Sequence, residues 1–271
     1  MADREVAVVT GVSSGIGEAT ARALEQAGYR VFGTVRSLAT AVPDGVERVL
    51  LDVRDDQSVR AGVKAILEKT GRIDALVNNA GVSLVAAIEE TETAQAQDLF
   101  DVNFFGAVRM TQAVLSPMRA QNRGRIAFVS SILGFLPGPY LGFYTASKHA
   151  LEGYSESLDH EVRGFGIRAF LIEPGFTKSK LDQSAARPAQ GIADYAVVRE
   201  RMGAIIRSSI AGGDDPALVA NTVVAALRAP NPKLRYPVGK GAGTLSKLRS
   251  LMPAGMFDRS FRKQYKLDGA L

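Results

Sequence analysis

The chain has 271 residues, of which 46% are hydrophobic and 23% charged, a composition typical of one large globular domain and unlike that of disordered or fibrous chains. It contains no cysteine and only two histidines, which excludes disulfides, thiolate metal sites and cysteine nucleophiles, so we expect no metal centre. No apolar run is long enough to span a membrane and no apolar signal segment follows Met1, so we expect a cytoplasmic protein.

The net charge of +5 is located at the C-terminal end. Residues 240–271 carry seven basic and two acidic side chains, so residues 1–239 are neutral overall. The basic residues lack the interleaved aromatic side chains and the reader motifs that are typical of nucleic-acid-binding proteins. We therefore expect no nucleic-acid partner.

Short apolar runs alternate with amphipathic helical stretches along residues 1–238. The runs are rich in Val, Ile and Leu without strict alternation, which is typical of parallel strands buried on both faces. The predicted strands are Val6–Thr10, Arg30–Val35, Arg48–Leu51, Ile73–Asn78, Arg125–Ser130, Ile167–Ile172 and Leu234–Val238. Repetition of the strand–helix unit predicts an α/β fold in which helices cover both faces of a parallel sheet.

Two segments depart from this rhythm. Residues 177–213 are long for a connection and contain an apolar stripe at helical spacing, which favours a substrate loop or lid. Asp215 and Pro216 then predict the start of a helix over Ala217–Leu227, because aspartate caps helices and proline suits their first position. The second departure is the basic segment 240–271, so we predict one domain over residues 1–239 followed by a helical extension.

The first predicted strand runs into the loop Thr10-Gly11-Val12-Ser13-Ser14-Gly15-Ile16-Gly17, inside which a helix begins. Glycines in such a loop let the backbone turn tightly and let a pyrophosphate bind the free N–H groups of the helix N-terminus. The loop lacks the lysine of a nucleoside triphosphate P-loop, which disfavours triphosphate hydrolysis. An ordinary strand-to-helix turn is the alternative interpretation.

The second predicted strand ends at Val35-Arg36-Ser37, where an NAD enzyme usually places a carboxylate for the ribose 2′-hydroxyl. The arginine here can instead pair with a 2′-phosphate. We therefore predict NADP(H) in preference to NAD(H), with a solvated surface arginine as the alternative.

Tyr144 and Lys148 are four residues apart, which places them on one face of a predicted helix, about 5–6 Å from each other. A free tyrosine is a poor base at neutral pH, but a neighbouring ammonium group favours the phenolate and lowers the tyrosine pKa. Ser131, after the fifth predicted strand, can offer its hydroxyl to the same reacting oxygen. Together with the glycine loop, the pair predicts acid–base chemistry beside a bound nucleotide.

These motifs, in their order along residues 6–238, resemble the short-chain dehydrogenase/reductase superfamily in its single-domain branch. The matching motifs are Thr10–Gly17, Leu51-Asp52-Val53, Asn78-Asn79-Ala80-Gly81, Val102-Asn103, Ser130-Ser131, Tyr144 with Lys148, and Pro174-Gly175. The resemblance implies a Rossmann-type, doubly wound seven-stranded parallel sheet in three α/β/α layers, and a bound nicotinamide dinucleotide.

The resemblance also implies four catalytic residues. Tyr144 would donate a proton to a carbonyl or accept one from an alcohol, and Ser131 would orient that oxygen. Lys148 would hold the nicotinamide ribose and lower the Tyr144 pKa. Asn103 would hold a water linking Lys148 to solvent, although a helix-bending core asparagine is also a sufficient interpretation of its place in an apolar helical pattern.

The remaining residues implied by the resemblance would bind the cofactor together with Tyr144 and Lys148. Around the pyrophosphate we expect Gly11, Ser13, Ser14, Ile16 and Gly17; near the 2′ position Arg36 and Ser37; at the adenine Asp52 and Val53; at the adenosine ribose Asn79, Ala80 and Gly81; and at the nicotinamide Pro174, Gly175, Phe176 and Thr177. Ser179 stands where the family often has threonine. Predicted strands are followed by the loop at Gly11 and by Arg36, Asp52, Asn79, Ser131 and Pro174. The carboxyl ends of the strands meet at one crevice in doubly wound sheets.

The extension 240–271 resembles that of family members acting on steroids, retinoids or other bulky lipophilic carbonyls and alcohols. It has three interpretations: helices packed on the domain, a wall or lid of the substrate pocket, or a membrane-surface helix. Gly138, Pro139, Leu141 and Phe143 are expected to form part of the substrate wall. By family analogy alone we expect a homodimer or homotetramer.

The function that we expect is an NADP(H)-dependent oxidoreductase that interconverts a secondary alcohol and a ketone, or an aldehyde, on a lipophilic substrate. A same-fold epimerase or dehydratase is one alternative. A nucleotide-sensing protein without catalytic activity is the other.

Overall fold

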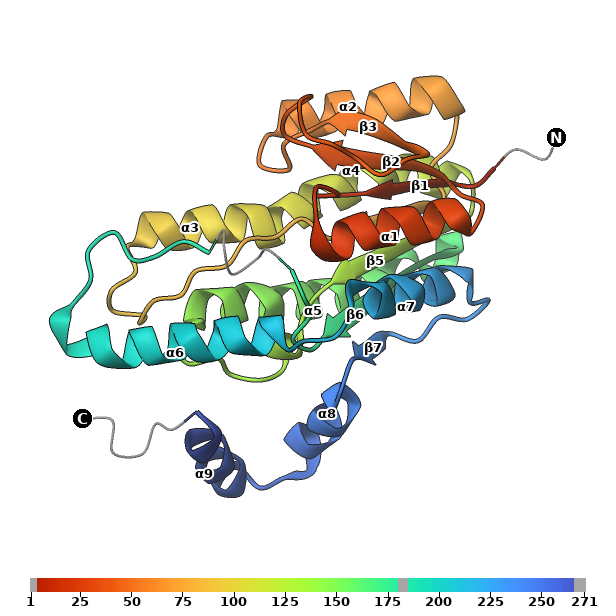
Figure 1. The fold of residues 1–271 in the computed structure, drawn as a ribbon. Helices are drawn as coiled ribbons and strands as arrows, with labels where there is room; N and C mark the ends of the chain where they lie inside the picture. Colours follow the sequence, from red (N-terminus) through yellow and green to blue (C-terminus); the bar gives the residue numbers. More distant parts are fainter. Residues whose placement is uncertain (1–3, 180–184, 266–271) are drawn as a thin grey trace.

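The computed structural model describes residues 4–179 and 185–265. Within these ranges seven strands form one parallel sheet in the order β3-β2-β1-β4-β5-β6-β7, which confirms the predicted doubly wound Rossmann-type fold (Figure 1). The strands are β1 (Val6–Val9), β2 (Arg30–Val35), β3 (Val46–Leu50), β4 (Ala75–Asn78), β5 (Gly124–Val129), β6 (Ile167–Pro174) and β7 (Arg235–Val238). Their ends lie within two residues of the prediction.

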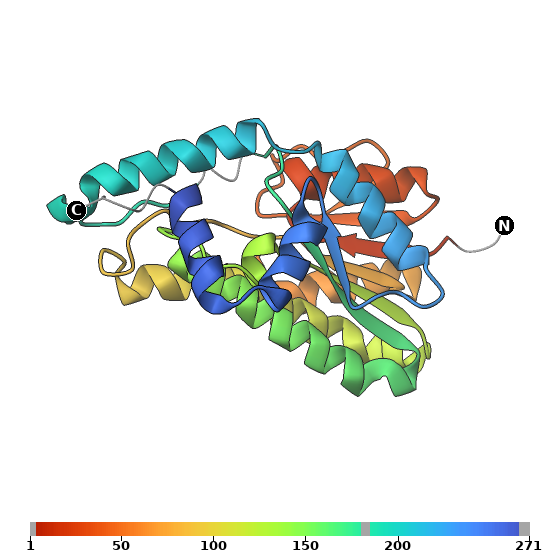
Figure 2. The same cartoon turned by 90° about the horizontal axis from the view of Figure 1, so that it is seen from below.

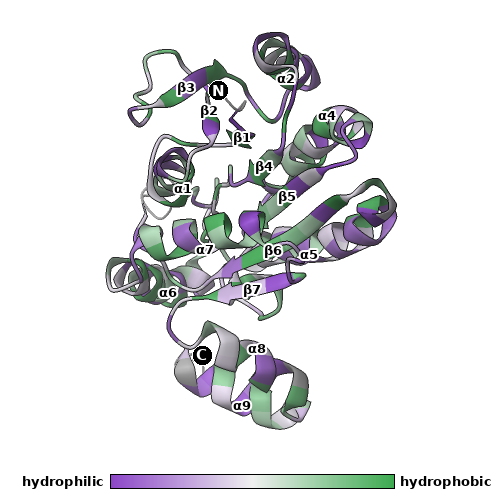
Figure 3. Cartoon of the chain, turned by 90° about the vertical axis from the view of Figure 1, so that its right-hand side faces the viewer, coloured by the Kyte–Doolittle hydropathy of each residue, from purple (hydrophilic) through white to green (hydrophobic). Residues whose placement is uncertain are grey.

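Helices cover both faces of the sheet, as the alternating pattern predicts (Figure 3). The helices are α1 (Gly15–Gln26), α2 (Asp56–Thr70), α3 (Thr93–Phe100), α4 (Gly106–Ala120), α5 (Gly142–Val162), α6 (Ala193–Ala211), α7 (Pro216–Arg228), α8 (Ala242–Leu251) and α9 (Ala254–Gln264). The described residues also form three short helical turns: a π-turn at Asp101–Phe105 and 3-10 turns at Ile132–Gly134 and Arg163–Phe165.

Alternate residues of each strand serve the two helical layers. In β1, Val6 and Val8 face the layer of α2, α4 and α5, whereas Ala7 and Val9 face the layer of α1 and α7. All four are buried, so the strands need apolar side chains on both faces. This arrangement explains why the strands appear in the sequence as continuous apolar runs.

Helix α7 begins where the sequence predicts. The Asp215 side chain accepts a hydrogen bond from the Ala217 N–H at 2.8 Å, and Pro216 is the first helical residue. This cap satisfies an N–H that has no partner inside the helix, while proline has no N–H to satisfy there.

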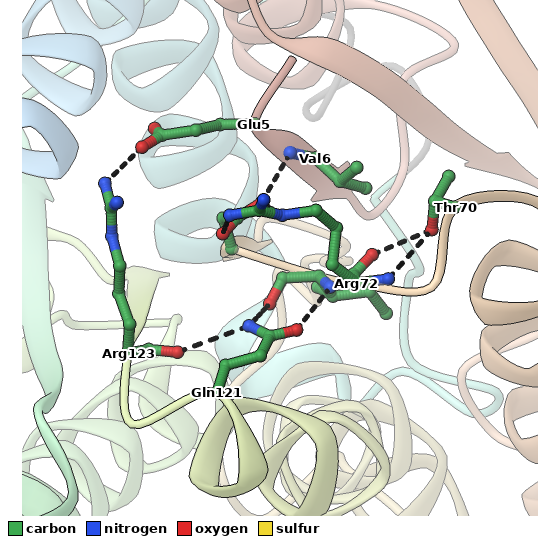
Figure 4. A network of polar contacts seen from close by, with 8 residues as sticks. Glu5, Val6, Thr70, Arg72, Gln121 and Arg123 are labelled. Carbon is green, nitrogen blue, oxygen red and sulfur yellow. Dashed lines mark hydrogen bonds and ion pairs between the residues drawn. The ribbon is translucent and has the colours of Figure 1, made fainter. Parts of the chain in front are cut away.

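Polar contacts join the segments at the amino ends of the central strands (Figure 4). The Asp74 carboxylate accepts from the backbone N–H of Val6 at 2.8 Å and pairs with Arg72 at 2.6 Å. The Gln121 side chain hydrogen bonds to both backbone groups of Ile73, which explains why β4 begins after Ile73 rather than at it. These contacts fix the amino ends of the central strands, and the candidate site lies at the opposite, carboxyl ends.

The C-terminal extension is helical, as predicted, and α8 and α9 lie along one side of the body (Figures 1 and 2). Leu245 of α8 and Phe257 of α9 pack against an apolar cluster that we call the apolar wall. Its buried members are Leu133, Leu136, Leu141 and Ile206. Across residues 4–179 and 185–265, no helix is both long enough and apolar enough to cross a bilayer.

Residues 193–211 of the long connection form α6, which explains the apolar stripe at helical spacing. Val198, Met202 and Ile206 of that stripe are buried. Residues 180–184, in the predicted substrate loop, and residues 266–271 of the extension lie outside the described residues.

Candidate active site

A cavity of about 1160 Å³ lies at the carboxyl ends of the strands. Every predicted cofactor residue lines it, as do three of the four predicted catalytic residues. Those that line it are Gly11, Ser13, Ser14, Ile16, Gly17, Arg36, Ser37, Asp52, Val53, Asn79, Ala80, Gly81, Ser131, Tyr144, Lys148, Pro174, Gly175, Phe176 and Thr177. Asn103 is the exception and lies behind the cavity wall.

The glycine loop forms a cradle because its backbone approaches the β4 end very closely. Gly11 adopts φ +70°, a conformation that favours glycine, and its carbonyl accepts a hydrogen bond from Asn79 Nδ2 at 3.1 Å. A Cβ on Gly17 would lie 2.2 Å from that same carbonyl oxygen and 2.4 Å from Asn79 Nδ2. Glycine is therefore required at position 17 for the loop to close against β4.

The start of α1 is available to an anion. Ser14 is its N-cap residue, with φ −170° and ψ 172°, but the Ser14 side chain makes no capping hydrogen bond. The first N–H groups of a helix have no partner within the helix and carry partial positive charge. This end of α1 opens into the cavity through Ser14, Gly15 and Ile16.

The substitution Gly17→Ala is expected to lower affinity for a dinucleotide at least tenfold and to reduce the free energy of unfolding by about 1–3 kcal/mol, because the methyl group displaces backbone. Fluorescence titration with NADPH and thermal unfolding measure the two effects. Gly153→Ala is the matched control, because a Cβ on that helical glycine meets nothing within 4 Å. Unchanged nucleotide binding in Gly17→Ala would show that the loop is not the cradle.

Charged groups surround the end of the cavity beyond β2 and β3. Asp52 and Arg54 form an ion pair at 2.6 Å, and the hydrogen bond from Arg54 holds the pKa of the Asp52 carboxyl below its usual range. Arg36 is exposed beside them, and among residues 4–179 and 185–265 no hydrogen bond or ion pair holds its guanidinium. A fixed carboxylate and an available guanidinium thus lie at the same rim.

Tyr144 and Ser131 meet on the floor of the cavity. Tyr144 lies in the first turn of α5, and Ser131 follows β5 and caps the short turn at Ile132–Gly134. Both side chains line the cavity. Burial raises the pKa of Tyr144 to about 12, and the neighbouring Ser131 hydroxyl lowers it by less. Tyr144 is therefore a neutral phenol at physiological pH.

The position of Lys148 corrects one expectation. Its Nζ lies 5.7 Å from the centroid of the Tyr144 ring and donates a hydrogen bond to the Val129 carbonyl at 2.9 Å. In this arrangement burial, rather than the ammonium charge, determines the Tyr144 pKa, so the predicted lowering by Lys148 does not occur. Burial also lowers the pKa of Lys148 itself, to about 8. The four-residue spacing predicted that the two side chains share one helix face, but not how deeply they are buried.

Asn103 lies in the π-turn between α3 and α4 and is buried. Its Oδ1 accepts from the Val82 N–H at 2.8 Å, and its Nδ2 donates to the Val82 carbonyl and to Ser147 Oγ. The side chain therefore joins the loop after β4 to the α5 residue that precedes Lys148. Its helix-bending environment agrees with the interpretation as a core asparagine.

The far side of the cavity is apolar. Leu133, Leu141, Ile206 and Ile210 line it and belong to or pack against the apolar wall. Of the four residues that the sequence places in the substrate wall, Leu141 lines the cavity. Gly138, Pro139 and Phe143 are not among the residues that line it.

Sequence reasoning missed several residues that line the cavity. Arg54 could have been found from its place two residues after Asp52. Ile206 was part of a helical stripe whose cavity-facing side the sequence does not reveal, and Ile210 lies beyond that stripe. Ser179, noted only as a departure from the family pattern, lies over the glycine loop, 3.2 Å from where a Cβ on Gly15 would be.

Comparison with known proteins agrees with this geometry. The family model for short-chain dehydrogenases matches residues 5–190. The chain is 36% identical over 266 residues to a 3-ketodihydrosphingosine reductase of Bacteroides thetaiotaomicron, covering 97% of this chain and 98% of that protein. It is 32% identical over 273 residues to the 17-beta-hydroxysteroid dehydrogenase type 1 of Mus musculus, covering 93% and 79% of the two chains.

Solved structures with the same fold include a short-chain dehydrogenase from Streptomyces avermitilis, with TM-score 0.79, 34% identity and coverage of 98% and 97%. A Burkholderia phymatum relative was solved with NAD (TM-score 0.75, 25% identity, coverage 86% and 89%). A metagenomic relative was solved with NADP (TM-score 0.68, 26% identity, coverage 85% and 95%). The chain belongs to the short-chain dehydrogenase/reductase family and is an oxidoreductase of that family acting on alcohol and carbonyl groups.

Proposed function

We propose that this protein is an NADP(H)-dependent oxidoreductase that interconverts a ketone or aldehyde and an alcohol on a lipophilic substrate. The observation that carries the proposal is that Ser131 and Tyr144 line one cavity together, between the glycine-loop cradle and the apolar wall. In this proposal residues 1–239 are the dinucleotide-binding and catalytic unit, and residues 177–213 with the extension cover the substrate end.

The residues present fit a nicotinamide dinucleotide. The close approach that requires Gly17, the uncapped start of α1 and the available Arg36 suit a pyrophosphate and a second anionic group. Asp52 and Val53 would bind the adenine, Asn79 to Gly81 the adenosine ribose, and Pro174 to Thr177 the nicotinamide. The cofactor supplies or accepts a hydride, and the protein determines orientation and proton transfer.

Tyr144 would act as the proton donor in carbonyl reduction. Its raised pKa keeps the phenolic proton in place at neutral pH, and Ser131 lies beside it to hydrogen bond to the substrate oxygen. When a carbonyl substrate is reduced, Tyr144 would pass its phenolic proton to the substrate oxygen, which gives the alcohol. Lys148 would hold the nicotinamide ribose and return a proton to Tyr144, and Asn103 would position the Lys148 region through Ser147.

The lipophilic substrate class is supported by the apolar wall and by the names of two relatives. Leu133, Leu141, Ile206 and Ile210 give the cavity an apolar side that suits aliphatic or polycyclic chains, and Leu245 of the extension packs behind them. The relatives are named as a ketodihydrosphingosine reductase and a hydroxysteroid dehydrogenase. Long-chain 3-keto compounds and ketosteroids are therefore the first substrates to assay.

The test of the function is consumption of NADPH and NADH over a panel of long-chain ketones, ketosteroids and short polar ketones. We expect NADPH to be consumed with lipophilic ketones and a long chain to lower KM. Epimerisation or dehydration without net cofactor oxidation would instead favour the same-fold alternative. Tight NADPH binding with no turnover on any carbonyl would favour the nucleotide-sensing alternative.

Arg36→Ala is expected to weaken NADPH binding by about 10- to 100-fold, roughly 1.5–3 kcal/mol for a charge-assisted contact, and to leave NADH affinity within about twofold. The reason is that only NADPH carries the 2′-phosphate that Arg36 would contact. Binding of both nucleotides is measured by isothermal titration calorimetry. Arg22→Ala on α1, where Arg22 already pairs with Glu18, is the control. Equal losses for both nucleotides would refute the role of Arg36.

A further inference from the structure

A group of charged side chains is buried behind the candidate active site, on the side away from the cavity. Glu152 lies one turn after Lys148 on α5 and has 4% of its surface exposed. Glu173 on β6 has none of its surface exposed. Burying two ionised carboxyl groups this completely lowers the stability of the folded protein unless they are paired or one is protonated.

Arg235 on β7 is the cation that these two carboxyls share. Its Nη1 pairs with Glu173 Oε1 at 2.7 Å and also with the Glu152 carboxylate. Its Nε pairs with Glu156 at 2.9 Å, and Glu156 is partly exposed on the outer side of the group. One guanidinium therefore faces two buried carboxyls and a third carboxylate at the surface.

One carboxyl oxygen in this group lacks a donor. Within the described part of the chain, Glu173 Oε2 is buried and accepts no hydrogen bond. Glu152 and Glu173 both bind Arg235 Nη1, so their carboxyl groups lie close together, and a proton on Glu152 would supply a donor to Glu173. With that proton the buried pair carries one negative charge opposite one guanidinium, and no acceptor is left unsatisfied.

The pair also contacts the loop that bears Ser131. The Ser130 hydroxyl donates a hydrogen bond to Glu152 Oε1, and Gly134 covers both groups. A Cβ on Gly134 would lie 2.4 Å from Glu152 Oε1 and 2.6 Å from Ser130 Oγ. The conformation of residues 130–134, including the Ser131 hydroxyl, thus depends on where the Glu152 carboxyl lies.

We propose that Glu152 and Glu173 share one proton and that this pair is a positioning element, which holds the Ser131 loop and sets the charge beside Lys148. The positioning role rests on the proposed function of Ser131 and Lys148; the shared proton does not. Glu152 and Glu173 touch neither the cavity nor the reacting atoms, so they act through Ser130 and Lys148.

The groups that face the pair determine how it responds to pH. They are Lys148 and Glu156 from α5, Ser130 after β5 and Arg235 from β7. Burial raises the pKa of Glu152 to about 8, and its negative charge in turn favours the ammonium form of Lys148. Above that pH the pair releases its proton to solvent and places a negative charge one turn from Lys148. This charge delays the loss of the Lys148 ammonium.

The first test uses infrared spectroscopy of the whole protein without nucleotide, so it is independent of turnover. At pH 6.5 we expect the carbonyl stretch of one protonated carboxyl, which disappears as the pH rises through about 8. Glu152→Gln should abolish this band, because the glutamine amide donates to Glu173 and leaves it ionised. Glu173→Gln should abolish it as well. Absence of the band in the unsubstituted protein, or its persistence in Glu152→Gln, would overturn the shared proton.

The second test compares pH profiles of kcat/KM. In Glu152→Gln the alkaline limb should move to lower pH by about one unit, because no charge can form beside Lys148. The ratio of variant to unsubstituted kcat/KM should therefore fall up to tenfold between pH 7 and pH 9. In Glu173→Gln the limb should not move down, because Glu152 is then ionised throughout.

Glu156→Gln is the matched control, since it removes the partly exposed partner of Arg235 without touching Ser130 or Lys148. Its alkaline limb should not move to lower pH as that of Glu152→Gln does. A purely structural role would lower kcat/KM by the same factor at every pH, and that result would overturn the positioning of Lys148. If no carbonyl is turned over at all, the proposed function fails, while the infrared titration still decides whether the proton is shared.

Discussion

Tyr144→Phe is expected to lower kcat for carbonyl reduction by about 10²- to 10⁴-fold, the usual contribution of a positioned acid or base. The substitution removes the hydroxyl that would donate the proton, while the ring that packs against the apolar wall remains. Steady-state rates with NADPH and a lipophilic ketone measure the effect. Affinity for NADPH should change by no more than a few-fold.

The control for this substitution is Tyr154→Phe on the same helix. Tyr154 packs edge-to-face against Phe104 and Phe128 on the core side of α5, away from the cavity. It should keep the unsubstituted rate within about twofold. If Tyr144→Phe retains more than a tenth of the rate, another group supplies the proton and the assignment is wrong.

Lys148→Met is expected to stabilise the protein by about 2 kcal/mol at pH 7 while abolishing turnover. Burial lowers the Lys148 pKa from 10.5 to about 8, which corresponds to a cost of about 3 kcal/mol for keeping the ammonium charged in the folded state. The substitution also removes the hydrogen bond to the Val129 carbonyl, which reduces the gain in the free energy of unfolding by about 1 kcal/mol. The thermal midpoint should rise by about 4 °C.

The sign of the pH dependence is a separate check. Below pH 8 the lysine is charged in both states, so the cost of burying the charge is fully present. Between pH 8 and 10.5 the folded state loses its proton first, so the unsubstituted protein gains stability and the advantage of Lys148→Met shrinks. Lys64→Met on the exposed face of α2 should change stability by less than about 0.5 kcal/mol. A Lys148→Met protein less stable than the parent at pH 7 would contradict the cost of burial.

The sheet and most of the cavity lining could be predicted from the sequence because they depend on local signals. Continuous apolar runs mark strands buried on both faces, and the spacing of Gly11 and Gly17 reports a close backbone approach that only glycine allows. The ends of the strands could not be predicted to the residue. A side chain distant in sequence, such as Gln121 beside Ile73, can take the hydrogen bonds that a neighbouring strand would otherwise make.

The depth of the catalytic groups could not be predicted. Spacing along α5 places Tyr144, Lys148 and Glu152 on one face, but burial depends on which strands pack against that face. For this reason the sequence predicted a lowered Tyr144 pKa, whereas burial raises it. The pairing of Glu152 with Glu173 and Arg235 was equally hidden, since it joins three elements that are far apart in the chain.

The measurement that tests the central claim most directly is the transfer of deuterium to a lipophilic ketone from NADPH that carries deuterium at both nicotinamide C4 positions. We expect one deuterium per turnover on the carbinol carbon of the product alcohol, one stereoisomer in excess, and a rate of transfer that falls in Tyr144→Phe by the factor expected for kcat. Product formed without deuterium on that carbon, or a rate of transfer in Tyr144→Phe within tenfold of the unsubstituted rate, would contradict hydride transfer at the Ser131–Tyr144 site.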